Sequence, residues 1–111
     1  MNLRRSHLAI WSLLSVSIPA LAQGPGWTAI STIVEVVDTM NGGVNVRLSP
    51  NLSGCTSQSG YGGSYASLYP THPGISRIKA SLLTAYATGS QISLYLNDDT
   101  CTIAEVRLGT F

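Results

Sequence analysis

The sequence predicts a small, mainly β domain with five strands and one helix, which stands between the third and the fourth strand. Segments in which apolar and polar residues alternate recur along the chain, separated by Gly, Asn and Ser, as in half-buried strands joined by turns. A helical spacing of apolar side chains occurs only between Ile75 and Gly89. Two cysteines, Cys55 and Cys101, favour one disulfide.

The first two strands are expected at residues 27–38 and 44–49, paired as a hairpin. The first is a β-branched run of Ile and Val, which favour strands. The second alternates Val44, Val46 and Leu48 with polar residues. Between them the Asn-Gly-Gly sequence at residues 41–43 tolerates the positive φ that a tight hairpin turn requires.

A third strand is expected at residues 64–69, after a loop rich in Ser, Gly and Asn that Cys55 anchors. Its alternation places polar or aromatic residues on one side of the strand and apolar residues on the other. Tyr65, Ser67 and Tyr69 lie on the first side, and Ala66 and Leu68 lie on the second. We expect Pro70 to end the strand.

The helix is expected to begin near Ile75 and to stop at Gly89, because glycine adopts the left-handed conformation of a helix C-terminus without a steric penalty. Ile75, Ile78, Leu82 and Tyr86 share one face of this helix. We therefore expect Tyr86 to lie in the core.

The fourth strand, residues 92–96, alternates Ile and Leu with polar residues, and a polar turn at residues 97–100 follows it. Cys101 opens the last strand, which runs to Leu108. The order of these elements is that of an OB-fold, a five-stranded and partly open Greek-key barrel. A small α+β sheet with the helix on one face has the same order, and the sequence leaves both open.

Residues 1–22 have the order of a secretory signal peptide, with Arg4 and Arg5 before an apolar segment and a small-residue triplet that ends at Ala22. Cleavage there leaves residues 23–111 as one OB-fold-like domain of a secreted or periplasmic protein. An oxidising compartment favours a disulfide between Cys55 and Cys101. Closing so long a loop stabilises a fold by about 4 kcal/mol.

The charge of the chain and the residue types it contains exclude several classes of function. From residue 23 on, four basic and five acidic residues offer no basic surface to nucleic acid, and no apolar run is long enough for membrane insertion. His72 is the single imidazole there and no nucleophile motif occurs, so we expect no enzyme, no catalytic residue and no cofactor. Two thiols and one imidazole do not make a metal site, and Asp98 and Asp99 are expected only to solvate a turn.

The segment LLTAYATGSQISLYL, from Leu82 to Leu96, carries a helix ending in Thr-Gly before an alternating strand, and a cysteine follows on the next turn. In this it resembles small secreted bacterial OB-fold proteins, among them the receptor-binding B subunits of toxins of the subtilase-cytotoxin and typhoid-toxin type. The resemblance implies an OB-fold, glycan binding at the barrel surface and a homo-oligomer. If copies assemble, exposed apolar side chains are expected, and Leu83 and Ile103 are the candidates.

These observations predict a non-catalytic module that binds a glycan or a protein. The contact surface is expected among aromatic side chains, which offer a flat apolar face and a polar tip. The resemblance adds Ser31 or Thr28 on the first strand as the polar contact. The candidates are Trp27, Ser31, Tyr61, Tyr65 and Tyr69. Covering one end of the barrel is the competing role for Tyr65 and Tyr69. The alternative function is a periplasmic protein-interaction, structural or inhibitor protein that binds no glycan.

Overall fold

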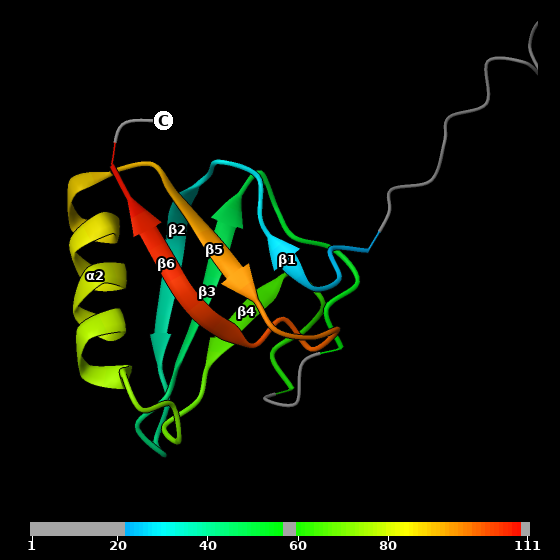
Figure 1. Ribbon diagram of the computed structural model, residues 1–111, viewed down its shortest axis with the longest axis horizontal. Helices are drawn as coiled ribbons and strands as arrows, with labels where there is room; N and C mark the ends of the chain where they lie inside the picture. The colour runs from blue at the N-terminus through cyan, green and yellow to red at the C-terminus, as the bar shows by residue number, and fades with distance from the viewer. Residues whose placement is uncertain (1–21, 57–59, 110–111) are drawn as a thin grey trace, which may run out of the picture.

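In the residues that the structure describes, the fold consists of six strands in two sheets and one helix (Figure 1). The computed structural model describes residues 22–56 and 60–109, so the predicted leader, apart from Ala22, lies outside the described residues. One antiparallel sheet has the order β1-β5-β6, and the other has the order β2-β3-β4. The strands are β1 (Gly26–Trp27), β2 (Thr32–Asp38), β3 (Val44–Ser49), β4 (Tyr65–Leu68), β5 (Ile92–Leu96) and β6 (Ile103–Leu108), with α2 (Ile75–Thr88) between β4 and β5.

The strand predicted at residues 27–38 is divided between the two sheets, which corrects the prediction of one continuous strand. Trp27 pairs with Tyr95 in the first sheet, whereas the chain from Thr32 on pairs with β3. Between them, Ser31 forms an isolated antiparallel bridge with Ile92. A β-branched run indicates a strand but does not specify its partner, so the change of sheet leaves no local signal.

The two sheets meet without a continuous ladder of hydrogen bonds. One contact is the bridge of Ser31 with Ile92, and the other is a single parallel bridge between Ser67 and Thr102. The described strands therefore form two three-stranded sheets and no closed barrel. The mainly β class, the one helix and the Cys55–Cys101 disulfide are confirmed.

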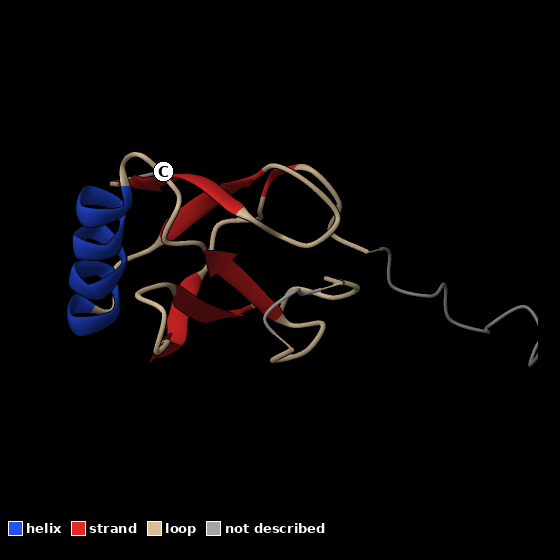
Figure 2. Ribbon diagram, turned by 90° about the horizontal axis from the view of Figure 1, so that it is seen from below, coloured by secondary structure: helices blue, strands red, loops and turns tan. Residues whose placement is uncertain are grey.

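The core lies between the inner faces of the sheets, and α2 covers one side of it (Figure 2). The helix contacts β2 in one sheet and β6 in the other. Burying each aliphatic side chain of this kind contributes about 1.5–3 kcal/mol. The most deeply buried include Val46, Leu48, Leu68, Leu82, Ile92, Leu94, Leu96 and Ile103.

The helix ends as predicted and faces the core with a different set of residues. Gly89 adopts φ 68° and its N–H donates to the Ala85 carbonyl, as a left-handed C-cap requires. Leu82 and Ala85 are buried, whereas Tyr86 is 47% exposed. The prediction of Tyr86 as a core residue was wrong, because its neighbour Ala85, which is fully buried, belongs to the core in its place.

The last strand starts at Ile103, two residues later than predicted, and a bulge changes its alternation. The register with β5 shifts between Glu105 and Ile103, so Ala104 is an extra residue. The bulge turns Ile103 to the inner side, where it is fully buried. Ile103 is therefore not an exposed assembly residue, while Leu83 is 38% exposed.

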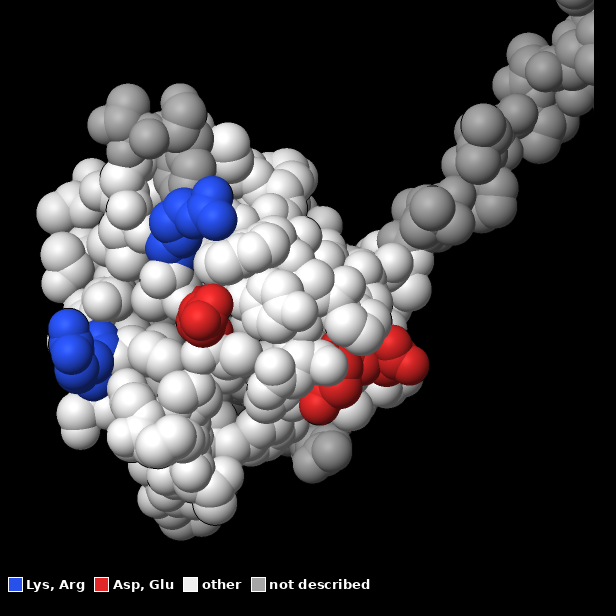
Figure 3. Space-filling view, in the orientation of Figure 1, with Lys and Arg blue, Asp and Glu red and all other residues white. Residues whose placement is uncertain are grey.

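Ionic side chains are sparse on the face drawn in Figure 3, where basic and acidic groups lie apart in a largely uncharged surface. Elsewhere in the described part of the chain, Arg47 lies 3.0 Å from Glu35 and Lys79 lies 3.2 Å from Asp38, each as an ion pair. Within the described ranges, no helix has the length and hydropathy of a membrane-spanning segment.

Candidate ligand-binding site

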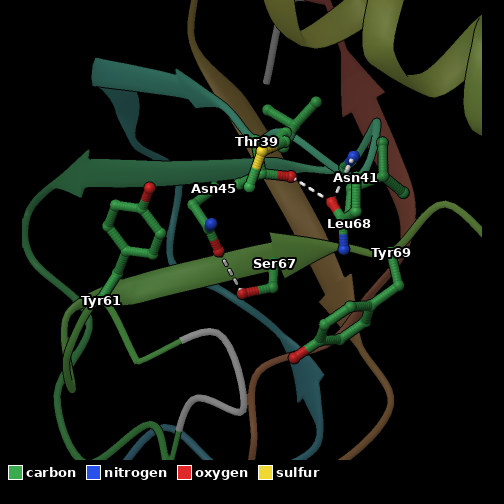
Figure 4. A pocket seen from close by; sticks show the side chains of 10 residues that line it. Thr39, Asn41, Asn45, Tyr61, Ser67, Leu68 and Tyr69 are labelled. Atoms are coloured by element: carbon green, nitrogen blue, oxygen red, sulfur yellow. Dashed lines mark hydrogen bonds between the residues drawn. The ribbon is translucent and has the colours of Figure 1, made fainter.

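A pocket of about 440 Å³ opens on the outer face of the β2-β3-β4 sheet (Figure 4). This volume falls in the range of roughly 300–1,000 Å³ that small-molecule sites occupy. Asn45 and Ser67 lie at the middle of the pocket, with Tyr61 on one side and Tyr69 on the other. The described lining residues are Thr39, Met40, Asn41, Gly43, Val44, Asn45, Tyr61, Ser67, Leu68 and Tyr69.

The floor of the pocket is a buried polar pair on neighbouring strands. Asn45 of β3 and Ser67 of β4 are directly opposite each other in the sheet, and each is only 2% exposed. The Ser67 hydroxyl donates to the side-chain oxygen of Asn45 at 2.5 Å. Because a buried polar group without a partner costs about 1–3 kcal/mol, this bond helps to keep both side chains in place at the base of the pocket.

The rim is the hairpin turn between β2 and β3, which the Asn-Gly-Gly sequence shapes. The Asn41 side-chain oxygen accepts hydrogen bonds from the Thr39 hydroxyl and from the Gly43 N–H. Any side chain at Gly43 is excluded, since its Cβ would lie 2.7 Å from the Leu68 carbonyl oxygen. The turn thus holds two polar side chains at the pocket entrance, beside the fully exposed Met40.

The two aromatic walls come from different parts of the chain. Tyr61 is 46% exposed, belongs to the loop after β3, and lies with its ring centre 5.7 Å from that of Tyr65. Tyr69 directly follows β4, and its hydroxyl is buried with no hydrogen-bond partner in the described part of the chain. The disulfide fixes the loop of Tyr61 by joining Cys55 to Cys101.

A charged row lies beside the pocket on the same outer face. Glu35, Arg47 and Tyr65 are opposite one another on three adjacent strands. The Tyr65 hydroxyl donates to Glu35 Oε1 at 2.7 Å, and Arg47 Nε donates to the same oxygen at 3.0 Å. The bond from Tyr65, followed by the bond from Arg47, lowers the pKa of Glu35 below its ordinary value. The carboxylate therefore stays ionised and paired.

Asp98 organises the turn that carries Cys101. Its Oδ1 accepts the N–H groups of Thr100 and Thr102, each at 3.1 Å, and the Thr100 hydroxyl at 2.7 Å. Partial burial raises the pKa of Asp98, but the hydrogen bonds from Thr100 and Thr102 together outweigh it and lower the pKa. In the described residues, no group of three His, Cys, Asp or Glu side chains is placed to hold a metal ion.

The single imidazole outside the predicted leader serves a structural contact. His72 Nε2 lies 2.8 Å from the Ala104 carbonyl oxygen, and Nδ1 accepts the Gly74 N–H at 2.8 Å. Nε2 therefore carries the proton in this arrangement. Both ring nitrogens are used to join the segment before α2 to β6.

The structure divides the predicted contact residues into two groups. Tyr61, Tyr65 and Tyr69 gather on the β2-β3-β4 sheet. Trp27 lies on the other sheet, where its ring meets Tyr95 edge to face at 5.3 Å and the Arg107 guanidinium lies 4.4 Å from its centre. Ser31 is 4% exposed, so little of it reaches the surface, and its hydroxyl donates to the Ala29 carbonyl at 2.8 Å.

Four polar residues at the pocket were missed by sequence reasoning: Thr39, Asn41, Asn45 and Ser67. The alternation of β3 points Asn45 outward, and an outward polar residue is ordinarily exposed. The sequence did contain one signal for a covered polar site: Ser67 lies between Tyr65 and Tyr69 on one side of β4, and large aromatic rings can cover a small polar neighbour.

No family model, no curated protein and no solved structure matches this chain.

Proposed function

We propose that this protein is an exported, non-catalytic binding module of the OB-fold type, and that it binds a glycan in the pocket between Tyr61 and Tyr69. The observation that carries the proposal is the buried Asn45–Ser67 pair at the base of that pocket. Hydrogen-bonding groups at the bottom of an aromatic-walled hollow are the usual combination in small-ligand sites.

The order and pairing of the strands support an OB-type arrangement. The first extended stretch takes part in both sheets, through Trp27 and through β2. The helix stands between β4 and β5. The parallel bridge of Ser67 with Thr102 joins β4 to β6, which brings together the third and the last extended stretches of the chain. These pairings support a partly open five-stranded barrel.

Export is supported by the disulfide. Cys55 and Cys101 are joined, and such bonds persist in oxidising compartments. We therefore assign the protein to the periplasm or the exterior of the cell, as the order of residues 1–22 also predicts.

A binding role without catalysis is supported by how the reactive side chains are used. His72 has a hydrogen bond at each ring nitrogen, and both thiols are consumed in the disulfide. General acid–base and nucleophilic catalysis need such groups within reach of a substrate. Around the pocket, the described residues supply amides, hydroxyls and aromatic rings.

A glycan suits the pocket better than a protein segment does. Sugar rings combine apolar faces with hydroxyls that both donate and accept, and the pocket combines tyrosine rings with amide and hydroxyl groups. A protein partner is the second candidate, and the exposed Trp27 with Tyr95 and Arg107 favours it, because aromatic residues and Arg are enriched at protein interfaces.

The test is a glycan array probed with protein purified after expression of the full chain. Tyr61→Ala should weaken the strongest signals roughly tenfold, the equivalent of about 1.4 kcal/mol. Tyr86→Ala is the matched control, since Tyr86 is equally exposed and lies on α2, away from the pocket. Absence of binding across the array by folded protein would refute the glycan proposal.

The protein-partner candidate has its own test. A pull-down from periplasmic extract with wild-type protein should then recover one partner that Trp27→Ala loses and Tyr61→Ala retains. Assembly of several copies, which the family resemblance implies, is tested by the mass from light scattering. A monomer at micromolar concentration would contradict the assembly that the resemblance implies.

A further inference from the structure

We infer that the pocket selects an uncharged sugar unit and discriminates against sugars that carry a carboxylate, sulfate or phosphate. This inference rests on the proposed glycan binding and specifies its substrate class. It follows from the charge, burial and hydrogen-bonding chemistry of the pocket.

The described lining of the pocket contains no Asp, Glu, Lys, Arg or His side chain. Its polar groups are the amides of Asn41 and Asn45, the hydroxyls of Thr39 and Ser67, and the tyrosines. An anionic group placed among them loses its hydration without gaining an opposite charge. That loss is costly even when neutral donors remain.

The nearest ionic groups on this face of the sheet do not offer a counter-charge. Arg47, on the same strand as Asn45 and on the same outer face, donates to Glu35 at 3.0 Å. Glu35 also accepts the Tyr65 hydroxyl. An arriving carboxylate would therefore meet Glu35, a like charge, together with Arg47. Asp38 of β2 is paired with Lys79 of α2 at 3.2 Å.

The floor suits neutral hydroxyls. An amide and a hydroxyl each present both donor and acceptor character, and a sugar hydroxyl does the same, so the two surfaces can match without ions. Asn45 and Ser67 are each 2% exposed, so a group that reaches them leaves water almost completely. Burial makes the absence of an opposite charge decisive, since low local dielectric magnifies the cost of a lone charge.

The direct test compares neutral glycans with counterparts that differ by one acidic group, on an array and by calorimetry. The probes are lactose against sialyllactose, and trigalactose against trigalacturonic acid. Each neutral member that binds is expected to bind at least about tenfold more tightly than its acidic counterpart. Equal or tighter binding of the acidic members would overturn the selectivity while leaving glycan binding in place. Failure of all neutral and acidic probes by folded protein would overturn both proposals.

A charge placed at the rim tests the cause of the selectivity. Met40 lines the pocket and its side chain is fully exposed, so Met40→Lys introduces a cation without disturbing the core. At low salt, the ratio of acidic-probe to neutral-probe affinity should be at least about threefold higher for this variant than for Met40→Gln. An unchanged ratio of acidic to neutral binding would refute the electrostatic explanation.

Discussion

Removal of the disulfide, by Cys55→Ala with Cys101→Ala, is expected to lower the free energy of unfolding by about 4 kcal/mol. The two cysteines are 46 residues apart, and the chain-entropy relation for a loop of that length gives this value at 25 °C. Small domains have about 5–15 kcal/mol of stability in total. The bond therefore accounts for a large part of what keeps this domain folded.

The variant should still fold, because backbone hydrogen bonds hold the same segments together. The Thr56 N–H donates to the Asp99 carbonyl, and the Ser67 N–H donates to the Cys101 carbonyl, each at 3.0 Å. These bonds keep the loop of Tyr61 near β4. We expect a native circular-dichroism spectrum with a lower urea midpoint.

Urea denaturation followed by circular dichroism measures the loss. The variant should show a larger dependence of the free energy on urea, because its unfolded chain exposes more surface without the cross-link. Wild-type protein treated with reductant is the control and should lose a similar amount. A loss below about 1 kcal/mol would refute the reasoning, since it would mean that the unfolded chain keeps the two segments together without the bond.

Three further predictions concern the sheet and the helix. Tyr65→Phe should raise the pKa of Glu35 toward its ordinary value, and NMR should show this as a shift in the titration of the Glu35 carboxyl group. In the wild-type protein the folded state lowers this pKa. The stabilisation from Glu35 is therefore present above its unfolded pKa and disappears as pH falls through its folded pKa. An unshifted titration would contradict the hydrogen bond from the Tyr65 hydroxyl to Glu35. Tyr69→Phe should leave the stability measured by thermal unfolding unchanged or raise it, because it removes a buried hydroxyl that has no hydrogen-bond partner in the described residues. A decrease in the free energy of unfolding of more than about 1 kcal/mol would show that the hydroxyl is bonded. Leu82→Ala should cost about 2–5 kcal/mol, whereas Tyr86→Ala should cost under about 1 kcal/mol, and similar losses would contradict their assigned burial.

Local patterns predicted the elements that local chemistry determines. The Asn-Gly-Gly turn identified the β2-β3 hairpin, and Gly89 marked the end of α2 because its left-handed conformation is a property of glycine itself. The alternation of residues 65–68 placed Ala66 and Leu68 toward the core, where both are buried.

What the sequence could not predict depends on partners that are distant in the chain. Residues 27–38 have one strand-like composition, yet their two ends pair with β5 and with β3. The bulge at Ala104 reverses the face of Ile103 without any glycine or proline to announce it. On α2, Ala85 and Tyr86 both fit an apolar stripe, and only the packing of the helix in the folded protein shows that Ala85 is buried and Tyr86 is not.

The candidate site was predictable only through its aromatic rings. Tyr61, Tyr65 and Tyr69 lie together on one sheet, but the separation of Trp27 from them required the division of the first strand. Asn45 became a candidate only once its burial was known, since polar residues on an outer sheet face are common.

The most direct test of glycan binding at the Asn45–Ser67 pocket is an NMR titration of ¹⁵N-labelled protein with the neutral glycan that gives the strongest array signal. Binding in this pocket is expected to give the largest changes in amide chemical shift at Asn45, Ser67 and the turn at residues 39–43. Largest changes at Trp27 and Tyr95, with the pocket residues unmoved, would contradict it.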